Sequence, residues 1–542
     1  MPTLNWIGKE KVVNHHRDVP YRVLEHKYGF TAENGEQPEP TGSGNKIIHG
    51  DNLEALKSLL PEYEGKIKCI YIDPPYNTGE EKWVYNDNVN HPKIERWLGK
   101  VVGKDGEDLS RHDKWLCMMY PRVKLLQQLL HPDGVIFISI DDNEYSNLKI
   151  LCDEIFGANR YLASFTWKRR SSSMLSKNNV SVDHEYILCY SKTNAYIFRG
   201  IDKDYSSYSN PDNDPNGPWT LGDLTVGMTK DQRPNQFYDL VDPDTGNVFK
   251  ANPSRVWSYI PESMNERIKE GKVYFPDDIS KRPMNKRYLK DLKSKINPIS
   301  TWIKGLKEKS SGNEQKNILK SGMNTEGTKV IQSIFGQKVF DYPKPISLIE
   351  TLIQQVSRND DIILDSFSGS GTTAHAVLNI NKQDGGNRKF ILVEMEDYAN
   401  DITAERVKRV TKGFGTGSKK VEGIGGEFDY YKLGPALFDE NENLNEEVGL
   451  QKIREYIWFS ETRTPFTDSD SEQYLLGKKD DSVYYFIYEK DRLTTLDYDA
   501  LELIKTKGEQ YIIYADNCLL PADFMAKHNI IFKKIPRDIT RF

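Results

Sequence analysis

The sequence predicts an α/β fold in which helices cover both faces of a parallel sheet. The first observation is a series of short, almost continuously apolar runs, NKIIHG, IKCIYID and GVIFISID, between residues 45 and 141. Helical patterns separate these runs, as in PRVKLLQQLL, which ends at the breaker sequence PDG. The second observation is that the alternation returns late in the chain, in DIILDSFSGSGTTAHAVLNI and RKFILVEM. We therefore expect one sheet whose two halves are separated by a long insert.

Five segments are expected along the chain. Residues 1–45 form an arm that ends in the polar stretch AENGEQPEPTGSGN. Residues 46–163 and 336–428 hold the two halves of the sheet. Between them, residues 164–335 are rich in turn signals and lose the α/β pattern, as expected of an inserted domain. Residues 429–542 include the linker DENENLNEE and strand-like runs such as VYYFIYEK and EQYIIYAD, which predict a small α+β domain.

Composition excludes several classes of protein. The chain has 542 residues, of which 37% are hydrophobic and 28% charged, so it is neither a small binding module nor largely disordered. Its net charge is −6, so a nucleic-acid site would have to be local. The five cysteines form no CxxC pair and no cluster at metal-ligand spacing, so we expect no metal. We see no apolar run of signal-peptide or membrane-spanning length, and we expect a cytoplasmic protein that contacts no membrane.

A carboxylate and a rigid aromatic turn follow the second apolar run. Asp73, Pro74, Pro75 and Tyr76 come where a parallel strand would end, which is where open α/β sheets bind ligands. The two prolines fix two φ angles and remove two N–H donors, leaving the Asp73 side chain and the Pro74 carbonyl as converging acceptors. Two acceptors beside an aromatic face suit a planar amino group, such as adenine N6 or cytosine N4. The alternative is a proline-rich turn in which Tyr76 only packs.

A glycine-rich junction between a strand and a helix is the second candidate site. In DSFSGSGTTA, which starts at Asp365, Gly369 and Gly371 let the backbone approach a ligand near the N–H groups of a helix N-terminus. The same letters fit the dinucleotide pattern GxGxxA, with the acidic Glu394 about 20 residues further on, in position to bind ribose hydroxyls. The phosphate-binding pattern GxxxxGK[ST] is absent from the sequence, so nucleotide hydrolysis is not expected.

Two further features carry both a functional and a structural interpretation. Asp51 follows the first apolar run, where it would accept a hydrogen bond from the amine of a bound adenine ring, cap the helix that begins at Asn52, or do both. Residues 281–340 hold 14 Lys and Arg against 4 Asp and Glu, whereas residues 431–542 hold 15 against 21. This basic stretch indicates a binding surface for an anion or a solvated helical face.

Together these motifs resemble the DNA amino-methyltransferases that use S-adenosylmethionine. The DPPY block comes first, then the insert, then DYPKP at 341–345, then FSGSG, and this permuted order resembles the β class. IIHGDNLEALKSL, CIYIDPPYNTG, ISIDD, FDYPKP and DSFSGSGTTAHAV, together with the chain length, resemble the modification (Mod) subunit of type III restriction–modification systems. The resemblance covers residues 46–163 and 336–412. It implies a Rossmann-like methyltransferase fold with circularly permuted motif order, an inserted target-recognition domain at 164–335 and a C-terminal dimerisation or subunit-contact domain.

The resemblance also implies a reaction and the residues that perform it. The expected reaction transfers a methyl group from S-adenosylmethionine to adenine N6 in duplex DNA, after the base is flipped out of the helix. Asp73 and the Pro74 carbonyl would hold the target amine, Pro75 would shape the turn and Tyr76 would stack on the base. The implied cofactor-binding residues are Asp51, Lys344, Asp365, Phe367, Gly369, Gly371, Thr372 and Glu394. The residues expected to contact DNA phosphates are Lys281, Arg282, Lys286 and Arg287.

The resemblance further implies a homodimer and a helicase–nuclease restriction subunit as partner, since this sequence carries no helicase motif and no nuclease motif that we recognise. Adenine N6 is favoured over cytosine N4 because the family's cytosine-N4 members more often carry Ser where this chain has Asp73. Other interpretations remain open. A non-catalytic DNA-recognition subunit would explain the insert, a dinucleotide-dependent oxidoreductase would explain GSGTTA and Glu394, and charge does not exclude an RNA substrate. The insert shows no motif from which a recognition sequence follows.

Overall fold

The chain folds into two compact units, described here from a computed structural model. One unit comprises Met1–Arg199 and Ser300–Phe542, and the other comprises Gly200–Ile299. The residues that the structure describes are 3–78, 96, 99, 110–171, 179–308, 317–439, 441–467 and 472–540. Among them, no helix has the length and apolar character needed to cross a membrane.

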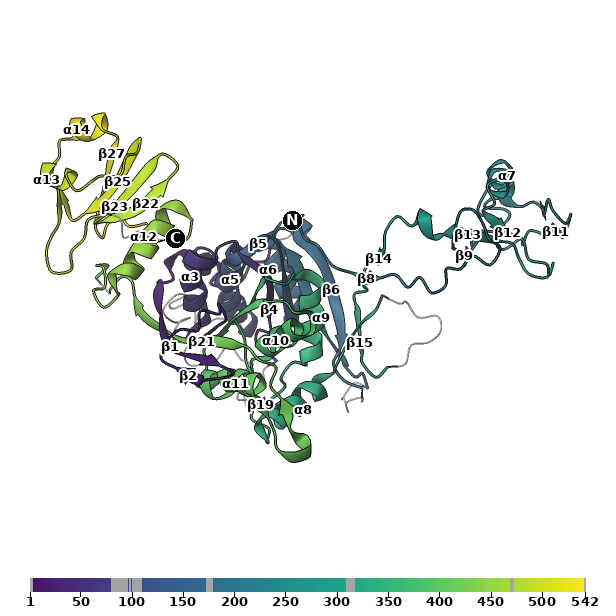
Figure 1. Ribbon diagram of the computed structural model, residues 1–542, viewed down its shortest axis with the longest axis horizontal. Coiled ribbons are helices and arrows are strands. Elements are labelled where there is room, and N and C mark those ends of the chain that lie inside the picture. The colour runs from purple at the N-terminus through teal and green to yellow at the C-terminus, as the bar shows by residue number, and fades with distance from the viewer. Residues whose placement is uncertain are drawn as a thin grey trace. The chain divides into compact units, whose positions relative to one another are not determined.

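A twelve-stranded sheet forms the centre of the first unit (Figure 1). In spatial order its described strands are β16 (Leu319–Ser321), β15 (Trp302–Gly305), β6 (Tyr161–Lys168), β7 (His184–Ser191), β5 (Leu130–Ile140), β4 (Ile67–Ile72), β17 (Ile362–Asp365), β18 (Lys389–Glu394), β3 (Lys46–His49), β21 (Glu427–Ala436), β1 (Arg22–Thr31) and β2 (Gly35–Gln37). The strands from β5 to β21 are all parallel, whereas β7 runs antiparallel to both of its neighbours. The predicted parallel sheet is confirmed.

Helices cover both faces of this sheet. On one face, α3 (Asn52–Tyr63), α5 (Arg111–Leu129) and α6 (Tyr145–Phe156) pack side by side, and on the other lie α9 (Ile346–Val356), α10 (Thr372–Asp384) and α11 (Glu405–Lys412) (Figure 1). All six residues of β4 are buried, as the apolar run IKCIYI requires of a strand that is covered on both faces. The layered arrangement is the Rossmann-like fold that the sequence predicted.

The two separated motifs come together in space because strands that are distant in the chain pair with each other. β4 and β17 are parallel neighbours, with Ile363 opposite Cys69 and Leu364 opposite Ile70. The loops that follow these two strands therefore open at the same edge of the sheet. β18 and β3 pair in the same way, with Glu394 opposite His49. Four candidate segments, after β3, β4, β17 and β18, thus reach one edge.

Residues Gly200–Ile299 form the second unit, which is built from short strands around a small core. Its described elements are β8 (Ile201–Asp202), β9 (Trp219–Gly222), β10 (Leu240–Val241), β11 (Val248–Phe249), α7 (Pro261–Lys269), β12 (Val273–Tyr274), β13 (Met284–Tyr288) and β14 (Ile296–Asn297). Its core contains Leu224, Phe249, Trp257 and Met264. This unit lies inside the predicted insert of 164–335. The flanking residues supply β7, β15, β16 and α8 (Asn324–Phe335) to the first unit, because these strands pair within its sheet. The sequence pattern did not indicate this, since the strands do not alternate with helices.

The two ends of the chain add further structure to the first unit. Part of the predicted N-terminal arm forms α1 (Lys9–Val12), α2 (His15–Asp18) and the edge strands β1 and β2. After α12 (Leu450–Thr462) comes a four-stranded sheet with the order β22 (Leu475–Lys479), β23 (Ser482–Phe486), β25 (Gln510–Ala515), β27 (Ile530–Lys534). The remaining short elements here are β24 (Thr495–Leu496), α13 (Tyr498–Leu501), β26 (Asn517–Cys518) and α14 (Ala522–Lys527). Before β21, β19 (Gly413–Phe414) and β20 (Val421–Glu422) form a short antiparallel pair. The C-terminal elements form a small α+β arrangement, as the sequence predicts.

Candidate active site

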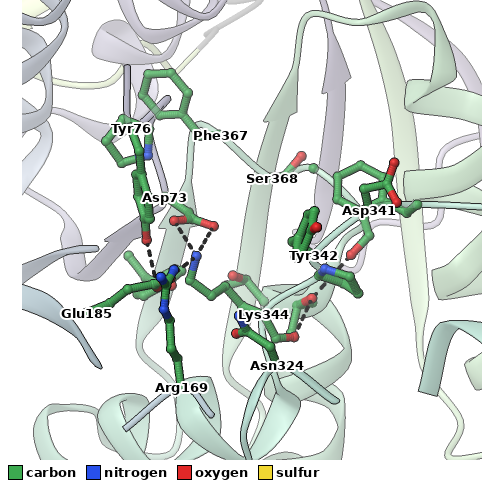
Figure 2. Close-up of a pocket in the computed structure, with 18 of the residues that line it drawn as sticks. Asp73, Tyr76, Arg169, Glu185, Asn324, Asp341, Tyr342, Lys344, Phe367 and Ser368 are labelled. Carbon is green, nitrogen blue, oxygen red and sulfur yellow. Dashed lines mark hydrogen bonds and ion pairs between the residues drawn. The ribbon is translucent and has the colours of Figure 1, made fainter. Parts of the chain in front are cut away.

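A cavity of about 480 Å³ opens where β4 and β17 end. Residues from both predicted motifs line it (Figure 2). The predicted site residues among its lining are Asp73, Pro74, Tyr76, Lys344, Asp365, Phe367, Gly369 and Thr372. Its volume and its place at the carboxyl ends of two adjacent parallel strands are typical of a ligand site in an open α/β sheet.

Two helices fix the turn that carries Asp73 and Tyr76. The indole Nε1 of Trp115, on α5, donates a hydrogen bond of 2.7 Å to the Pro75 carbonyl. Asn77 adopts a left-handed φ of 58°, and its side-chain amide donates to the fully buried Glu144 carboxylate. These contacts hold the loop from below while Asp73 and Tyr76 line the cavity. Pro75, which is not among the lining residues, contacts Trp115 and so helps to set the turn.

The Lys344 ammonium group is bound to the carboxylate of Asp73. Its Nζ donates to Asp73 Oδ1 at 2.8 Å and to Oδ2 at 2.7 Å (Figure 2). It also lies over the Tyr76 ring, 4.9 Å from the ring centroid. Lys344 was expected on the cofactor side because of its place in the motif order. The structure instead brings its side chain to the predicted catalytic carboxylate.

Glu185, on β7, completes this group and was not predicted from the sequence. Its Oε2 accepts a hydrogen bond from the Tyr76 hydroxyl at 3.0 Å and lies 3.6 Å from Lys344 Nζ (Figure 2). Its Oε1 accepts a bond of 2.8 Å from Nη1 of Arg169. An acidic residue at the start of the otherwise apolar run EYILCY was the available signal, because a lone charge in a buried strand needs partners.

Burial and ion pairing have opposite effects on the pKa values of Asp73, Glu185 and Lys344. Burial raises the pKa of Asp73 above its ordinary value, although Lys344 partly offsets the effect. Burial also raises the pKa of Glu185, but Lys344 and Arg169 outweigh it and hold that pKa below its ordinary value. Burial acts to lower the pKa of Lys344, and the two carboxylates outweigh it, so that pKa lies above its ordinary value. Lys344 is therefore cationic and Glu185 anionic at neutral pH.

The glycine-rich loop takes the backbone conformations that its sequence predicts. Gly369 and Gly371 have φ angles of 49° and 76°, in the left-handed region where a side chain is strained. A Cβ on Gly371 would lie 3.0 Å from the Thr403 carbonyl oxygen. The hydroxyl of Ser368, which lines the cavity, is buried and makes no hydrogen bond to the described residues. A ligand in the cavity would supply the missing partner.

A buried arginine that was not predicted from the sequence supports this loop. Nη1 of Arg406, on α11, donates to the Ser370 carbonyl at 3.2 Å and to the Ser370 and Thr372 hydroxyls at 2.9 and 2.8 Å. Burial lowers the pKa of Arg406 to about 9, which leaves it charged at neutral pH. Because hydrogen bonds to a charged donor are strong, Arg406 fixes the loop from beneath.

Asp51 and Glu394 lie at the same sheet edge but are not among the residues that line the cavity. Asp51 caps α3, since its Oδ1 accepts from the backbone N–H groups of Leu53 and Glu54 at 2.9 and 3.2 Å. The predicted capping role is confirmed. Oε2 of Glu394 accepts a bond of 2.7 Å from the Gly369 N–H. Contacts of Asp51 with an adenine ring and of Glu394 with a ribose stay predictions.

Burial also raises the pKa values of the acidic residues that end β17 and β18. It raises the pKa of Asp365 to about 7 and that of Glu394 to about 8. A buried carboxyl group of this kind favours a cationic ligand, because a positive charge beside it restores the ionised form. Asp365 lines the cavity, so it is placed to meet such a ligand.

The family of this chain follows from its sequence match over the same region. Residues 67–405, more than half of the 542, match the family model described as DNA methylase. This span includes both candidate motifs and the segment between them. The chain belongs to the DNA methylase family. The predicted resemblance to DNA amino-methyltransferases is thereby confirmed.

Three curated relatives of this DNA methylase are modification enzymes. The Mod subunit of the type III restriction-modification enzyme StyLTI, from Salmonella typhimurium, is 35% identical over 74% of this chain and 59% of its own length. The EcoP15I Mod subunit from Escherichia coli is 30% identical over 76% and 69%. The type II methyltransferase M.KpnI from Klebsiella pneumoniae is 33% identical over 71% and 93%. The match thus spans less than two thirds of the first of these relatives.

The four basic residues expected to contact DNA lie in the second unit and differ in their surroundings. The Lys281 side chain is 73% exposed and that of Arg282 is 49% exposed. Arg287 is also exposed. The Lys286 side chain is only 10% exposed, and its ammonium group is paired with Asp212 and Asp214. Because two carboxylates already neutralise it, Lys286 is better suited to stabilising this unit than to binding a phosphate. Residues 309–316 of the basic stretch lie outside the described residues.

Proposed function

We propose that this DNA methylase transfers a methyl group from S-adenosylmethionine to adenine N6 in duplex DNA, at a specific sequence and after base flipping. The observation that carries the proposal is the shared cavity, in which Asp73 and Tyr76 lie with Asp365 and Gly369. An amine acceptor and a cation-binding loop in one cavity are what a reaction between an amine and a sulfonium methyl group requires.

The loop after β17 fits the cofactor. S-adenosylmethionine supplies a methyl group that is already activated by its sulfonium charge. Asp365 would pair with the cationic methionine end, and the Ser368 hydroxyl would gain a hydrogen-bond partner. Phe367 would form an apolar wall, while Gly369 leaves room for a ligand close to the backbone. Glu394 would then keep the loop in place through the Gly369 N–H.

The turn after β4 fits the target amine. A flipped adenine would stack on the Tyr76 ring, with one N6 hydrogen directed at Asp73 and the other at the Pro74 carbonyl. Hydrogen bonds to both hydrogens oppose delocalisation of the nitrogen lone pair into the ring. The nitrogen would then bond to the methyl carbon as the carbon–sulfur bond breaks and S-adenosylhomocysteine leaves. Asp73 would stabilise the positive charge that develops on the nitrogen until one N6 proton passes to solvent. The chain thus contributes positioning and electrostatic stabilisation.

We propose adenine rather than cytosine as the target base. Asp73 occupies the position where cytosine-N4 enzymes more often have Ser, and two of the relatives described above are named as Mod subunits. We accordingly propose that the chain is the modification and recognition subunit of a type III restriction–modification system. A homodimer, a helicase–nuclease restriction subunit as partner and a cytoplasmic location belong to the same proposal.

DNA recognition is assigned to the unit Gly200–Ile299, within the predicted domain of 164–335. Exposed Lys281, Arg282 and Arg287 are the candidate phosphate contacts. The C-terminal residues 429–542 are assigned to dimerisation or subunit contact. Phosphate contacts position a protein on DNA without selecting a sequence, so base-edge contacts from other side chains of this unit must provide specificity.

The test is transfer of labelled methyl from S-adenosylmethionine to mixed-sequence duplex DNA, followed by nucleoside analysis. We expect N6-methyladenine. N4-methylcytosine would change the target base and leave the rest of the proposal in place. A folded protein that binds the cofactor but labels no DNA would contradict the proposal and favour a recognition subunit or an RNA substrate. Binding of NAD(P) without S-adenosylmethionine binding would favour an oxidoreductase.

A further inference from the structure

The ammonium group of Lys344 contacts two groups that a target base would need, the Asp73 carboxylate and the Tyr76 ring. Its Nζ donates to both oxygens of Asp73, at 2.8 and 2.7 Å, and lies 4.9 Å from the centroid of the Tyr76 ring. Under the proposed function, the target amine binds Asp73 while its ring stacks on Tyr76. One cation therefore contacts both expected partners of the base.

Charge gives a second reason for Lys344 to leave Asp73. Methyl transfer moves positive charge from the sulfonium group to the attacking nitrogen, so an anionic carboxylate beside that nitrogen stabilises the transition state. An ammonium group that is bound to both oxygens of Asp73 offsets this negative charge. At such short distance it also repels the developing cation.

Glu185 offers the ammonium group a second position. Its Oε2 lies 3.6 Å from Lys344 Nζ, and its side chain is only 4% exposed. It accepts two other bonds, from Tyr76 at 3.0 Å and from Arg169 at 2.8 Å. An ionised carboxylate has about four acceptor positions, so Glu185 has capacity for Lys344 as well. Because a buried charge without a partner is strongly unfavourable, Lys344 needs this carboxylate if it leaves Asp73.

We infer that Lys344 occupies the target-base position while no base is bound, and that Glu185 is the positioning residue that receives its ammonium group when the base enters. This inference rests on the proposed function and deepens it. Asp73 then exchanges its cationic partner for the neutral target amine, which donates a hydrogen bond to it, while the Lys344 ammonium group stays paired with a carboxylate throughout. Tyr76, whose hydroxyl already binds Glu185, keeps its ring in place during the exchange.

A pair of variants in the full chain tests this exchange. Glu185→Gln keeps the size of the side chain and removes the charge that receives Lys344. We expect kcat/KM for DNA to fall at least tenfold while the affinity for S-adenosylmethionine changes less than twofold. Adding Lys344→Met removes the ammonium group, so the double variant should be more active than Glu185→Gln alone. Since Lys344 lowers the pKa of Asp73, both variants are assayed from pH 6 to pH 9.

Glu144→Gln is the matched control. Glu144 is also a fully buried carboxylate next to the same turn, but it accepts from Asn77 and His112. Any loss of activity that this variant causes should not be relieved by Lys344→Met. A purely structural role for Glu185 predicts the same lack of relief for Glu185→Gln.

Two results would overturn the inference: wild-type kcat/KM for Glu185→Gln, or a double variant that is no more active than Glu185→Gln at any pH. If Glu185→Gln does not fold, a structure of the wild-type chain with duplex DNA and an inert cofactor analogue decides. Lys344 Nζ bound to Glu185 supports the exchange, and Lys344 on both oxygens of Asp73 beside a bound base contradicts it. Absence of methyl transfer by the wild-type chain would count against the proposed function instead.

Discussion

The side-chain carboxyl group of Glu394 holds the backbone of Gly369, since its Oε2 accepts a hydrogen bond of 2.7 Å from the Gly369 N–H. The bond joins the end of β18 to the glycine-rich loop after β17. The strands β17 and β18 are parallel neighbours in the sheet. An acidic residue at this position therefore shapes the candidate cofactor loop before any ligand binds.

Replacing Glu394 by Gln should change how stability depends on pH. The pKa of Glu394 is raised from 4.5 to about 8 by burial, so its contribution to stability is complete below about pH 4.5 and is lost as pH rises through about 8. Gln resembles the protonated acid and does not ionise. The free energy of unfolding of Glu394→Gln relative to wild type should rise between pH 6 and pH 9, by at most about 1.4 kcal/mol per pH unit. Urea unfolding without cofactor measures this difference, and an equal difference at both pH values would contradict it.

Cofactor affinity should rise with pH through the ionisation of Asp365. Burial raises its pKa from 3.8 to about 7, so at pH 6 the carboxyl group is mostly neutral. The cationic methionine end of S-adenosylmethionine favours the ionised form. The dissociation constant should therefore fall between pH 6 and pH 8, by at most about tenfold per pH unit. Asp365→Asn should bind more weakly and lose this pH dependence in calorimetry, and a wild-type constant that does not change with pH would argue against the assignment.

Gly371→Ala should damage the loop more than an equivalent change elsewhere. Gly371 has a φ of 76°, and an added Cβ would lie 3.0 Å from the Thr403 carbonyl oxygen. Gly385, at the other end of α10, has a φ of 71° with nothing within 4 Å of an added Cβ. Gly385→Ala should lower the free energy of unfolding by about 1–2 kcal/mol from backbone strain alone. Gly371→Ala should lose more stability and also weaken cofactor binding, and equal effects of the two variants would exclude the steric contribution.

Replacing Lys286 should lower stability, whereas replacing Lys281 should change the salt dependence of DNA binding. Lys286→Met leaves Asp212 and Asp214 without their cation, so we expect a lower melting temperature. Lys281→Met should leave the melting temperature unchanged. It should remove about one phosphate contact, so the slope of the logarithm of the DNA-binding constant against the logarithm of salt concentration should become less steep by about 0.9. Binding of the full chain to duplex DNA at several salt concentrations measures the slope. An unchanged slope for Lys281→Met would remove this residue from the DNA surface.

The sequence predicts the central sheet well because buried parallel strands consist of continuous apolar runs. IKCIYI and DIILD each form one strand, and the acidic residue after or at the end of each reaches the same sheet edge. The strands β7, β15 and β16 and most of β6 were assigned to the insert instead. They include antiparallel pairs and do not alternate with helices, so the pattern that identified the sheet was missing there.

Side-chain partners explain the remaining differences. Lys344 was placed by the order of the motifs, but its partner Asp73 is 271 positions away in the sequence. Lys286 was counted with the other basic residues, although Asp212 and Asp214 lie more than 70 positions before it. Charge counting does not distinguish a buried, paired lysine from an exposed one. Only the folded chain shows which charges are already neutralised.

The central claim is that Asp73 binds the target amine, and the most direct measurement is methyl transfer by Asp73→Ala together with its affinity for S-adenosylmethionine. The variant removes the acceptor and leaves the glycine-rich loop after β17 unchanged. We expect transfer to duplex DNA to be lost while cofactor binding by calorimetry is largely retained. Parallel loss of transfer and cofactor binding would contradict this account and place Asp73 in the cofactor site.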